Sequence, residues 1–249
     1  MIKQIIYYLI DKTFPGFENQ IIDLVRNKKN IIIFDIGCFK GFFFKKFFKS
    51  KILKESKLKF YLFDINPNVR DYLKKYINKK NIFFEYLGIG KSNQTKKYYL
   101  NKSFESSGSS MSNLYKDDKL WVLSRKIFLK LFFQKTPSYQ SLKVPVIRLD
   151  DYIKKRKVKK IDILKIDVDG SEEDVLAGMH SILKKNIVSI LQIEITGMKN
   201  AYKKKENKIY SLLKKNNFIL KRKKYFLSVS ILSKLRCTDN LFVHKNLNQ

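Results

Sequence analysis

The fold is decided at residues 165–172, which have the sequence Lys-Ile-Asp-Val-Asp-Gly-Ser-Glu. A run rich in β-branched residues, 161–168, includes the start of this stretch and predicts a strand buried on both faces, as in a parallel sheet. Asp167 and Asp169 fall at the carboxyl end of that strand, which is the edge where open α/β sheets bind ligands. The stretch therefore predicts a parallel α/β sheet with two carboxylates at its ligand-binding edge.

A helix is predicted directly after these carboxylates. Ser171, with Asp174 three residues later, resembles a capping box, and apolar residues follow at 175, 176, 179 and 182. The acids at 172–174 have a simple explanation, because negative charge in the first turn of a helix offsets the helix dipole. That explanation suits Asp167 and Asp169 much less well, since both precede the helix. These two acids are therefore the candidates for chemistry.

Two earlier strands end in a similar way. The apolar run 31–34 leads into residues 35–41, Asp-Ile-Gly-Cys-Phe-Lys-Gly, and the strand 58–63 leads into Asp64. Glycine lets a backbone approach a ligand that a Cβ would exclude, although this spacing is not that of a dinucleotide-binding turn. An acid after the second strand is where a nucleoside-binding α/β fold grips a ribose diol. Asp64 could also be a simple turn residue ahead of Pro67, but the two strand ends together favour a nucleoside ligand.

Strands and helices alternate along the rest of the chain. Further strands are predicted at 82–87, 97–100, 144–149 and 188–195, and helices at 17–26, 42–49, 69–77 and 203–217, with a turn at 88–90. A closing antiparallel pair, 218–220 and 241–244, is predicted to be separated by a mobile segment, 221–240.

We expect an N-terminal helical segment, residues 1–29, packed on a domain that spans 30–249 and carries an insertion at about 103–140. Within the insertion, the serine-rich stretch 103–112 predicts a flexible loop. The basic and aromatic stretch 117–135 predicts either a buried helix or a lid that suits a membrane surface or an acceptor.

The chain of 249 residues carries a net charge of +31, and seven of its 53 basic residues are Arg. Such a charge can attract nucleic acid, anionic lipid or an acidic glycan. Arg is the residue of bidentate phosphate recognition, so its scarcity weakens a dedicated nucleic-acid function. Lys, Ile, Asn, Phe and Tyr are abundant and have A/T-rich codons, which favours compositional drift as the cause. We expect weak association with an anionic membrane surface and no specific nucleic acid.

The two cysteines, Cys38 and Cys237, have no metal-type spacing, which suits a reducing compartment and argues against a disulfide framework. No segment reaches the roughly 18 apolar residues that a bilayer-spanning helix needs. The first 14 residues show no small-residue cleavage site. These features predict a cytoplasmic protein.

Five motifs occur in a fixed order. They are Asp35-x-Gly37 with Gly41, Phe63-Asp64-x-Asn66-Pro67, Arg148-Leu149-Asp150-Asp151, residues 165–172 with Val175-Leu176-x-Gly178, and Gln192-Ile193-Glu194. This order resembles the FkbM family of S-adenosylmethionine-dependent methyltransferases, over roughly residues 30–243. The resemblance implies a class I, Rossmann-like α/β fold: a seven-stranded, mostly parallel sheet with one antiparallel strand near the C-terminus and helices on both faces.

The resemblance also implies a cofactor, S-adenosyl-L-methionine, and the residues that hold it. The glycine turn would hold its methionine part and Asp64 would accept from its ribose hydroxyls. The implied cofactor-binding residues are Asp35, Gly37, Cys38, Gly41, Asp64 and Asn66. Three departures stand out: Cys38 and Phe39 replace the family's Ala and Asn, and Asp64 and Asp169 stand where the family more often has Glu.

The implied reaction is O-methylation, commonly of sugars in surface glycans or of natural products. Methyl transfer is an in-line displacement, so the protein mainly aligns donor and acceptor and removes the proton of the acceptor hydroxyl. Asp167 is the first candidate for the base or orienting group, followed by Asp169 and Glu194, because a partly desolvated carboxylate can have its pKa raised into the working range. Lys165 is expected to pair with an acid. Asp167 and Asp169 could hold a divalent metal, but two acids without a third ligand are weak evidence for one, and we assign no metal site.

We therefore expect a cytoplasmic O-methyltransferase that acts on a sugar hydroxyl of a glycan or glycosylated precursor. Two alternatives stay open. The charge favours an RNA methyltransferase, although the Asn/Asp-Pro-Pro-aromatic tetrapeptide of amino-directed nucleic-acid methylases is missing. A degenerate, non-enzymatic basic scaffold is the other, because the ring of Phe39 could fill part of the cofactor cleft.

Overall fold

The computed structural model describes residues 16–102, 111, 123, 127, 130, 138–225 and 235–248. The segment 1–15, nearly all of the predicted loop at 103–112 and of the predicted helix at 117–135, and residues 226–234 lie outside this description.

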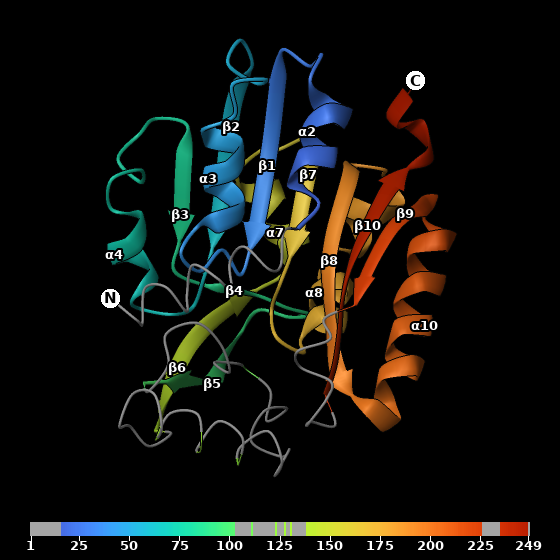
Figure 1. The fold of residues 1–249 in the computed structure, drawn as a ribbon. Coiled ribbons are helices and arrows are strands. Elements are labelled where there is room, and N and C mark those ends of the chain that lie inside the picture. Colours follow the sequence, from blue (N-terminus) through green and yellow to red (C-terminus); the bar gives the residue numbers. More distant parts are fainter. Residues whose placement is uncertain are drawn as a thin grey trace.

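A seven-stranded sheet forms the centre of the molecule, with strand order β3-β2-β1-β7-β8-β10-β9 (Figure 1). The strands are β1 (Asn30–Ile36), β2 (Lys57–Phe63), β3 (Ile82–Glu85), β7 (Ile161–Ile166), β8 (Val188–Met198), β9 (Phe218–Tyr225) and β10 (Leu235–His244). Only β10 runs against the others, because it pairs antiparallel with both β8 and β9. The predicted fold, a mostly parallel sheet with one antiparallel strand near the C-terminus, is confirmed.

Helices cover both faces of this sheet (Figure 1). One face packs against α2 (Glu18–Val25), α3 (Phe42–Phe48) and α4 (Val69–Leu73). The other packs against α7 (Leu149–Lys155), α8 (Glu172–Ala177), α9 (His180–Lys184) and α10 (Lys199–Lys215). A 3-10 turn, Lys245–Asn248, follows β10. The sheet is therefore the middle of three layers.

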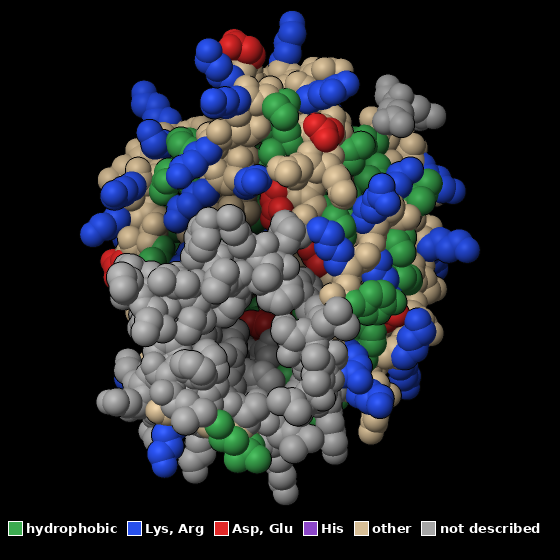
Figure 2. Space-filling model, viewed as in Figure 1, with side chains coloured by type: hydrophobic (Ala, Val, Ile, Leu, Met, Phe, Trp, Pro, Cys, Tyr) green, Lys and Arg blue, Asp and Glu red, His purple; other side chains and the backbone are tan. Residues whose placement is uncertain are grey.

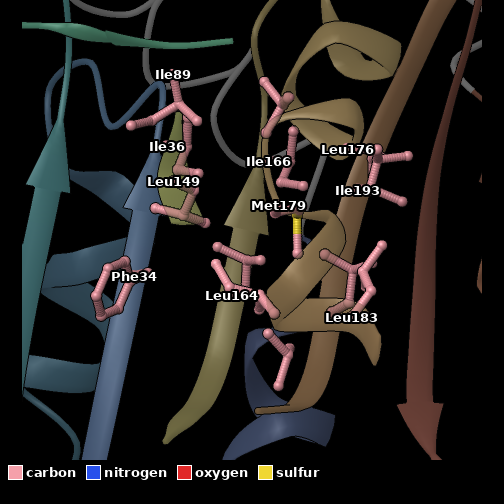
Figure 3. Close-up of a cluster of buried hydrophobic side chains, with 14 of the residues drawn as sticks. Phe34, Ile36, Ile89, Leu149, Leu164, Ile166, Leu176, Met179, Leu183 and Ile193 are labelled. Atoms are coloured by element: carbon pink, nitrogen blue, oxygen red, sulfur yellow. The ribbon is translucent and has the colours of Figure 1, made fainter. Parts of the chain in front are cut away.

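The central strands are buried on both faces, as their apolar runs predict. Ile33 pairs with Ile163 in register and faces α2 and α3, whereas Phe34 pairs with Leu164 and faces the other side. Figure 3 shows the second of these layers, in which side chains of β1, β7 and β8 meet those of α7, α8 and α9 and that of Met179, which lies between α8 and α9. Each such apolar side chain contributes roughly 1.5–3 kcal/mol by leaving water.

A second, three-stranded sheet has the order β4-β6-β5, with β4 (Gly88–Ile89), β5 (Gln94–Asn101) and β6 (Tyr139–Ile147). It lies beyond the carboxyl ends of the central strands (Figure 1). The turn predicted at 88–90 is wrong, because Gly88 and Ile89 pair parallel with β6, and the Gly90 amide donates to Ile147 O at 2.9 Å. Two residues are too few to show a strand pattern. The strand predicted at 144–149 also starts earlier, at Tyr139, inside the predicted insertion.

The helix predicted after Ser171 is two helices, α8 and α9, separated at Gly178 and Met179. A Cβ on Gly178 would lie 1.9 Å from Gly90 O, so the chain passes close to the second sheet at the break. The predicted capping box is wrong, since Ser171 makes no side-chain cap hydrogen bond. The carboxylate of Glu172 accepts from the Gly170 amide instead, at 2.7 Å.

The C-terminal strands are longer than predicted. Residues 221–225 continue β9 and residues 235–240 belong to β10, so the predicted mobile segment is wrong for these parts. In β9 this stretch is Lys- and Arg-rich, and in β10 it carries an acid, which hid both strands from a search for apolar runs. Within the described part of the chain, no helix has the length and apolar character needed to cross a membrane.

Candidate active site

Three parallel strands end side by side at one edge of the sheet. The turn after β1 is tied to both neighbours: the Gly37 amide donates to Phe63 O at 2.9 Å, and the Asp167 amide donates to Ile36 O at 2.9 Å. The ends of β1, β2 and β7, each followed or preceded by an acid, therefore form one connected surface.

Glycine is required at two positions of the turn after β1. Gly37 has a φ of +81°, and a Cβ there would lie 1.8 Å from Asp167 O. Gly41 has a φ of +72°, and its Cβ would lie 2.6 Å from the Leu73 side chain. The predicted glycine turn is present, and its first glycine is what allows β1 and β7 to approach.

Asp35 lies in this turn region with no exposed surface, and neither carboxylate oxygen has a hydrogen-bond partner among the described residues. Burial raises its pKa to about 7, with Lys165 opposing the rise and Asp167 and Asp64 adding to it. Buried polar groups are normally paired, so an orphaned carboxylate calls for a donor from outside the protein. Asp35 is therefore a buried carboxylate without a described partner, next to the turn that the sequence predicted to bind the cofactor.

Asp64, at the end of β2, is already used by the chain. Its Oδ2 accepts from the Phe39 amide at 2.7 Å and its Oδ1 accepts from the Asn66 amide at 2.8 Å. Burial raises its pKa to about 6. Asn66 in turn accepts from the Asn68 amide at 3.0 Å. Each carboxylate oxygen has a second lone pair, so Asp64 fixes the turn and can still accept from a diol.

The two unusual residues of the turn point their side chains into the protein. The Cys38 thiol is buried in the apolar cluster below α3, and its amide donates to Phe63 O at 3.1 Å. The Phe39 ring packs against the same cluster, with its centroid 6.5 Å from that of Phe42 and 6.2 Å from that of Tyr72. Both side chains therefore belong to the apolar layer that holds α3 and α4.

The predicted catalytic acids come together around Glu194. Burial raises the pKa of Glu194 well above its ordinary value, and the charges of Asp167 and Asp169 raise it further. Lys165 donates to Asp167 Oδ2 at 2.8 Å, as expected for this residue. Burial lowers the pKa of Lys165, but Asp167 and Asp35 outweigh burial and the net pKa is raised, so the ammonium stays charged. The site thus combines one fixed cation with a carboxyl that readily takes a proton.

Asp239 and Gln192 were missed as site residues. Gln192 Nε2 donates to Asp239 Oδ2 at 2.7 Å, while Gln192 Oε1 and Asp239 Oδ1 have no partner among the described residues. Burial raises the pKa of Asp239 to about 7, opposed by Lys165. Asp239 pairs with Glu194 in the register of β8 and β10. The sequence could have indicated this position only if residues 235–240 had been recognised as part of β10.

This edge is acidic on a very basic molecule. Figure 2 shows several Asp and Glu side chains near the middle of this face, with Lys and Arg side chains beside them and over the rest of the described surface. In the part of the chain that the structure describes, no three His, Cys, Asp or Glu residues are grouped so as to hold a metal ion.

The model of the methyltransferase FkbM domain matches residues 35–220. The chain belongs to the FkbM methyltransferase family. The resemblance drawn from the motifs is thereby confirmed, and the matched residues run from the orphaned Asp35 through the site acids to β9. No curated protein matches the sequence significantly.

Several solved methyltransferase structures have a similar chain path. An FkbM methyltransferase from Methylobacillus flagellatus KT is 12% identical, with 86% of this chain and 44% of that chain covered and a TM-score of 0.47. TrmK from M. capricolum, in complex with S-adenosyl-homocysteine, is 15% identical (94% and 69% covered, TM-score 0.43). Precorrin-6y C5,15-methyltransferase from Geobacter metallireducens GS-15 is 8% identical (95% and 96% covered, TM-score 0.44). The chain thus spans less than half of the first of these.

Proposed function

We propose that this FkbM-family protein is an S-adenosylmethionine-dependent O-methyltransferase that methylates a sugar hydroxyl in a glycan or a glycosylated precursor. The observation that carries the proposal is the group of carboxylates around Glu194, at the edge next to the glycine turn. A hydroxyl must lose its proton as it is methylated, and a carboxyl with a raised pKa is suited to receive that proton.

The residues of the turn fit the cofactor of the family. When bound, S-adenosylmethionine supplies an electrophilic methyl group. The orphaned carboxylate of Asp35 offers acceptors for the methionine ammonium, and the second lone pairs of Asp64 offer acceptors for the ribose hydroxyls. Gly37 and Gly41 let the turn after β1 take its left-handed conformation against Asp167 and Leu73, which sets the position of this turn beside the acids.

The acids divide the work on the acceptor. Asp167, held by Lys165, orients the acceptor hydroxyl, and Glu194 accepts its proton. Asp169 follows Asp167 in a left-handed conformation with a φ of +50° and adds negative charge beside Glu194. Positioning of this kind lowers the barrier because the reacting groups are already aligned.

An RNA acceptor fits this edge less well. Asp35, Glu194 and Asp239 bring carboxyl groups next to the expected position of the reacting hydroxyl, and burial raises the pKa of each. An ionised carboxylate repels a phosphate, so a phosphate is a poor ligand for this group of acids. A neutral polyhydroxy compound meets the carboxylates with hydrogen-bond donors instead.

Calorimetric titration of the protein with S-adenosylhomocysteine tests the cofactor site first, and micromolar affinity is expected. Labelled methyl transfer from S-adenosylmethionine is then measured to nucleotide sugars, polysaccharide and total RNA. We expect label in a sugar fraction as an ether. Asp167→Asn should lower that rate by about 100-fold or more while the affinity for S-adenosylhomocysteine changes less than about threefold.

Asp71→Asn is the matched control, because Asp71 is an exposed acid on α4, and it should leave both quantities unchanged. No binding of S-adenosylhomocysteine by the folded protein would contradict the proposal and favour a basic scaffold. Label confined to RNA would show that the alternative nucleic-acid function is correct.

A further inference from the structure

A buried ion pair lies directly behind the acids of the site. Glu172, at the start of α8, has no exposed surface, and it pairs with the ammonium of Lys205 from α10, whose side chain is 12% exposed. Burial raises the pKa of Glu172, and Lys205 opposes that rise. The helix dipole was a sufficient explanation in the sequence for the acids that follow Ser171. It does not explain why one of them, Glu172, is fully buried.

The ammonium of Lys205 also donates to two backbone carbonyls, one in the turn after β7 and one in β8. It donates to Gly170 O at 3.0 Å and to Thr196 O at 2.8 Å. Glu172 Oε1 accepts from the Gly170 amide at 2.7 Å, so both sides of Gly170 are held by the same ion pair. An ammonium has three donors, and all three are used here.

The two carbonyls belong to the segments that carry the acids. Gly170 follows Asp169 directly and lies three residues after Asp167, while Thr196 lies two residues after Glu194. Asp169 has a φ of +50°, a conformation that a non-glycine residue adopts only where the surroundings hold it. One side chain from α10 therefore connects the turn after β7 to the end of β8.

We infer that Lys205 is a positioning residue, which fixes the turn carrying Asp167 and Asp169 against the strand end carrying Glu194. Lys205 touches neither cofactor nor acceptor in this arrangement and acts only through the backbone of Gly170 and Thr196. The cofactor turn after β1 makes none of its described contacts with Lys205. This inference rests on the proposed methyl transfer at the same edge.

The acceptor is not needed to test the inference. Sinefungin resembles S-adenosylhomocysteine but carries a primary amine where the methyl sulfonium would be, so its ammonium samples the carboxylates at the transfer position. S-adenosylhomocysteine lacks that charge and reports on the cofactor turn alone. The ratio of the two dissociation constants therefore measures whether the acids are in place.

We expect the wild-type protein to bind sinefungin at least tenfold more tightly than S-adenosylhomocysteine. Lys205→Met should reduce this preference at least fivefold and change the affinity for S-adenosylhomocysteine less than twofold. Lys208→Met is the matched control, because Lys208 also joins α10 to α8, through Glu173 at 2.8 Å, but its side chain is 74% exposed. That variant should keep the full preference, since an exposed pair contributes little.

A double variant, Glu172→Gln with Lys205→Met, removes both buried charges and guards against a single variant that fails to fold. It should melt cooperatively and still lack the preference for sinefungin. An unchanged preference in a folded Lys205 variant, or an equal loss for both ligands, would overturn the inference while leaving the proposed function intact. A wild type that binds S-adenosylhomocysteine without preferring sinefungin would overturn the inference too. No binding of either ligand by the wild type would overturn the proposed function.

Discussion

Gly37→Ala should destabilise the protein by about 3–5 kcal/mol, which combines the strain of a positive φ with overpacking against backbone. The added Cβ would lie 1.8 Å from Asp167 O at a φ of +81°. That oxygen cannot retreat easily, because the Asp167 amide is bonded to Ile36 O at 2.9 Å. Urea unfolding of the variant and the wild type measures the difference.

Gly197→Ala is the control for this substitution. Gly197 lies in β8, and the nearest atoms to an added Cβ are 3.5 Å away or more, which is ordinary contact. The free energy of unfolding of the Gly197→Ala variant should be less than about 1 kcal/mol below that of the wild type. If Gly37→Ala lost no more unfolding free energy than the control, β1 and β7 could move apart at little cost. The surface formed by the strand ends would then not be rigid.

The parts of the fold that sequence predicted are those with a local cause. β1, β2, β7 and β8 are buried on both faces, so their apolar runs are visible without knowledge of their neighbours. The acids that follow these strands could also be predicted to lie near one another, because the carboxyl ends of parallel strands lie at one edge of a sheet. Asp167 was selected in this way, and its catalytic role stays a prediction.

The parts that sequence missed depend on distant partners. β4 is two residues long and exists because β6 pairs with it. β10 carries Asp239 in its interior, where the polar group is tolerated because Gln192 of β8 donates to it. The break between α8 and α9 follows from the approach of Gly178 to Gly90 O. None of these partners lies near in the sequence.

The role of Lys205 in the candidate site could not be predicted from the sequence either. In the sequence it is one of three consecutive lysines, 203–205, and nothing separates it from its neighbours. The neighbouring Lys203 has a side chain that is 73% exposed, whereas that of Lys205 is 12% exposed. Its position on the inner side of α10 is set by helix phase and by the buried carboxylate of Glu172.

Asp35→Asn should stabilise the protein above pH 7 by up to about 4 kcal/mol and have little effect near pH 4. The pKa of Asp35 is raised from 3.8 to about 7 in the folded protein, chiefly by burial. Between these values the folded state holds a proton that the unfolded chain has released, so this group makes stability fall as pH rises from about 4 to 7. The amide has no proton to lose, so the variant lacks this fall.

Asp162→Asn is the control with the opposite sign. Asp162 is also buried, but it accepts from Lys28 Nζ at 2.8 Å and from the Ile32 amide at 3.0 Å. Burial raises its pKa, these partners lower it, and the net pKa is below the ordinary value. Its ionised form therefore stabilises the fold, so Asp162→Asn should destabilise the protein at pH 7 and less so as pH falls below about 4.

Urea unfolding of both variants from pH 4 to pH 8 separates the two kinds of buried aspartate. The Asp35 variant should gain stability at the upper end and lose affinity for S-adenosylhomocysteine by about tenfold, or about 1.4 kcal/mol. If the Asp35 carboxylate lowers the stability of the fold and raises the affinity for the ligand, selection for stability cannot explain its presence, and selection for binding can. If Asp35→Asn were destabilising at pH 8, the carboxylate would have a partner within the protein, and its assignment to the cofactor ammonium would be wrong.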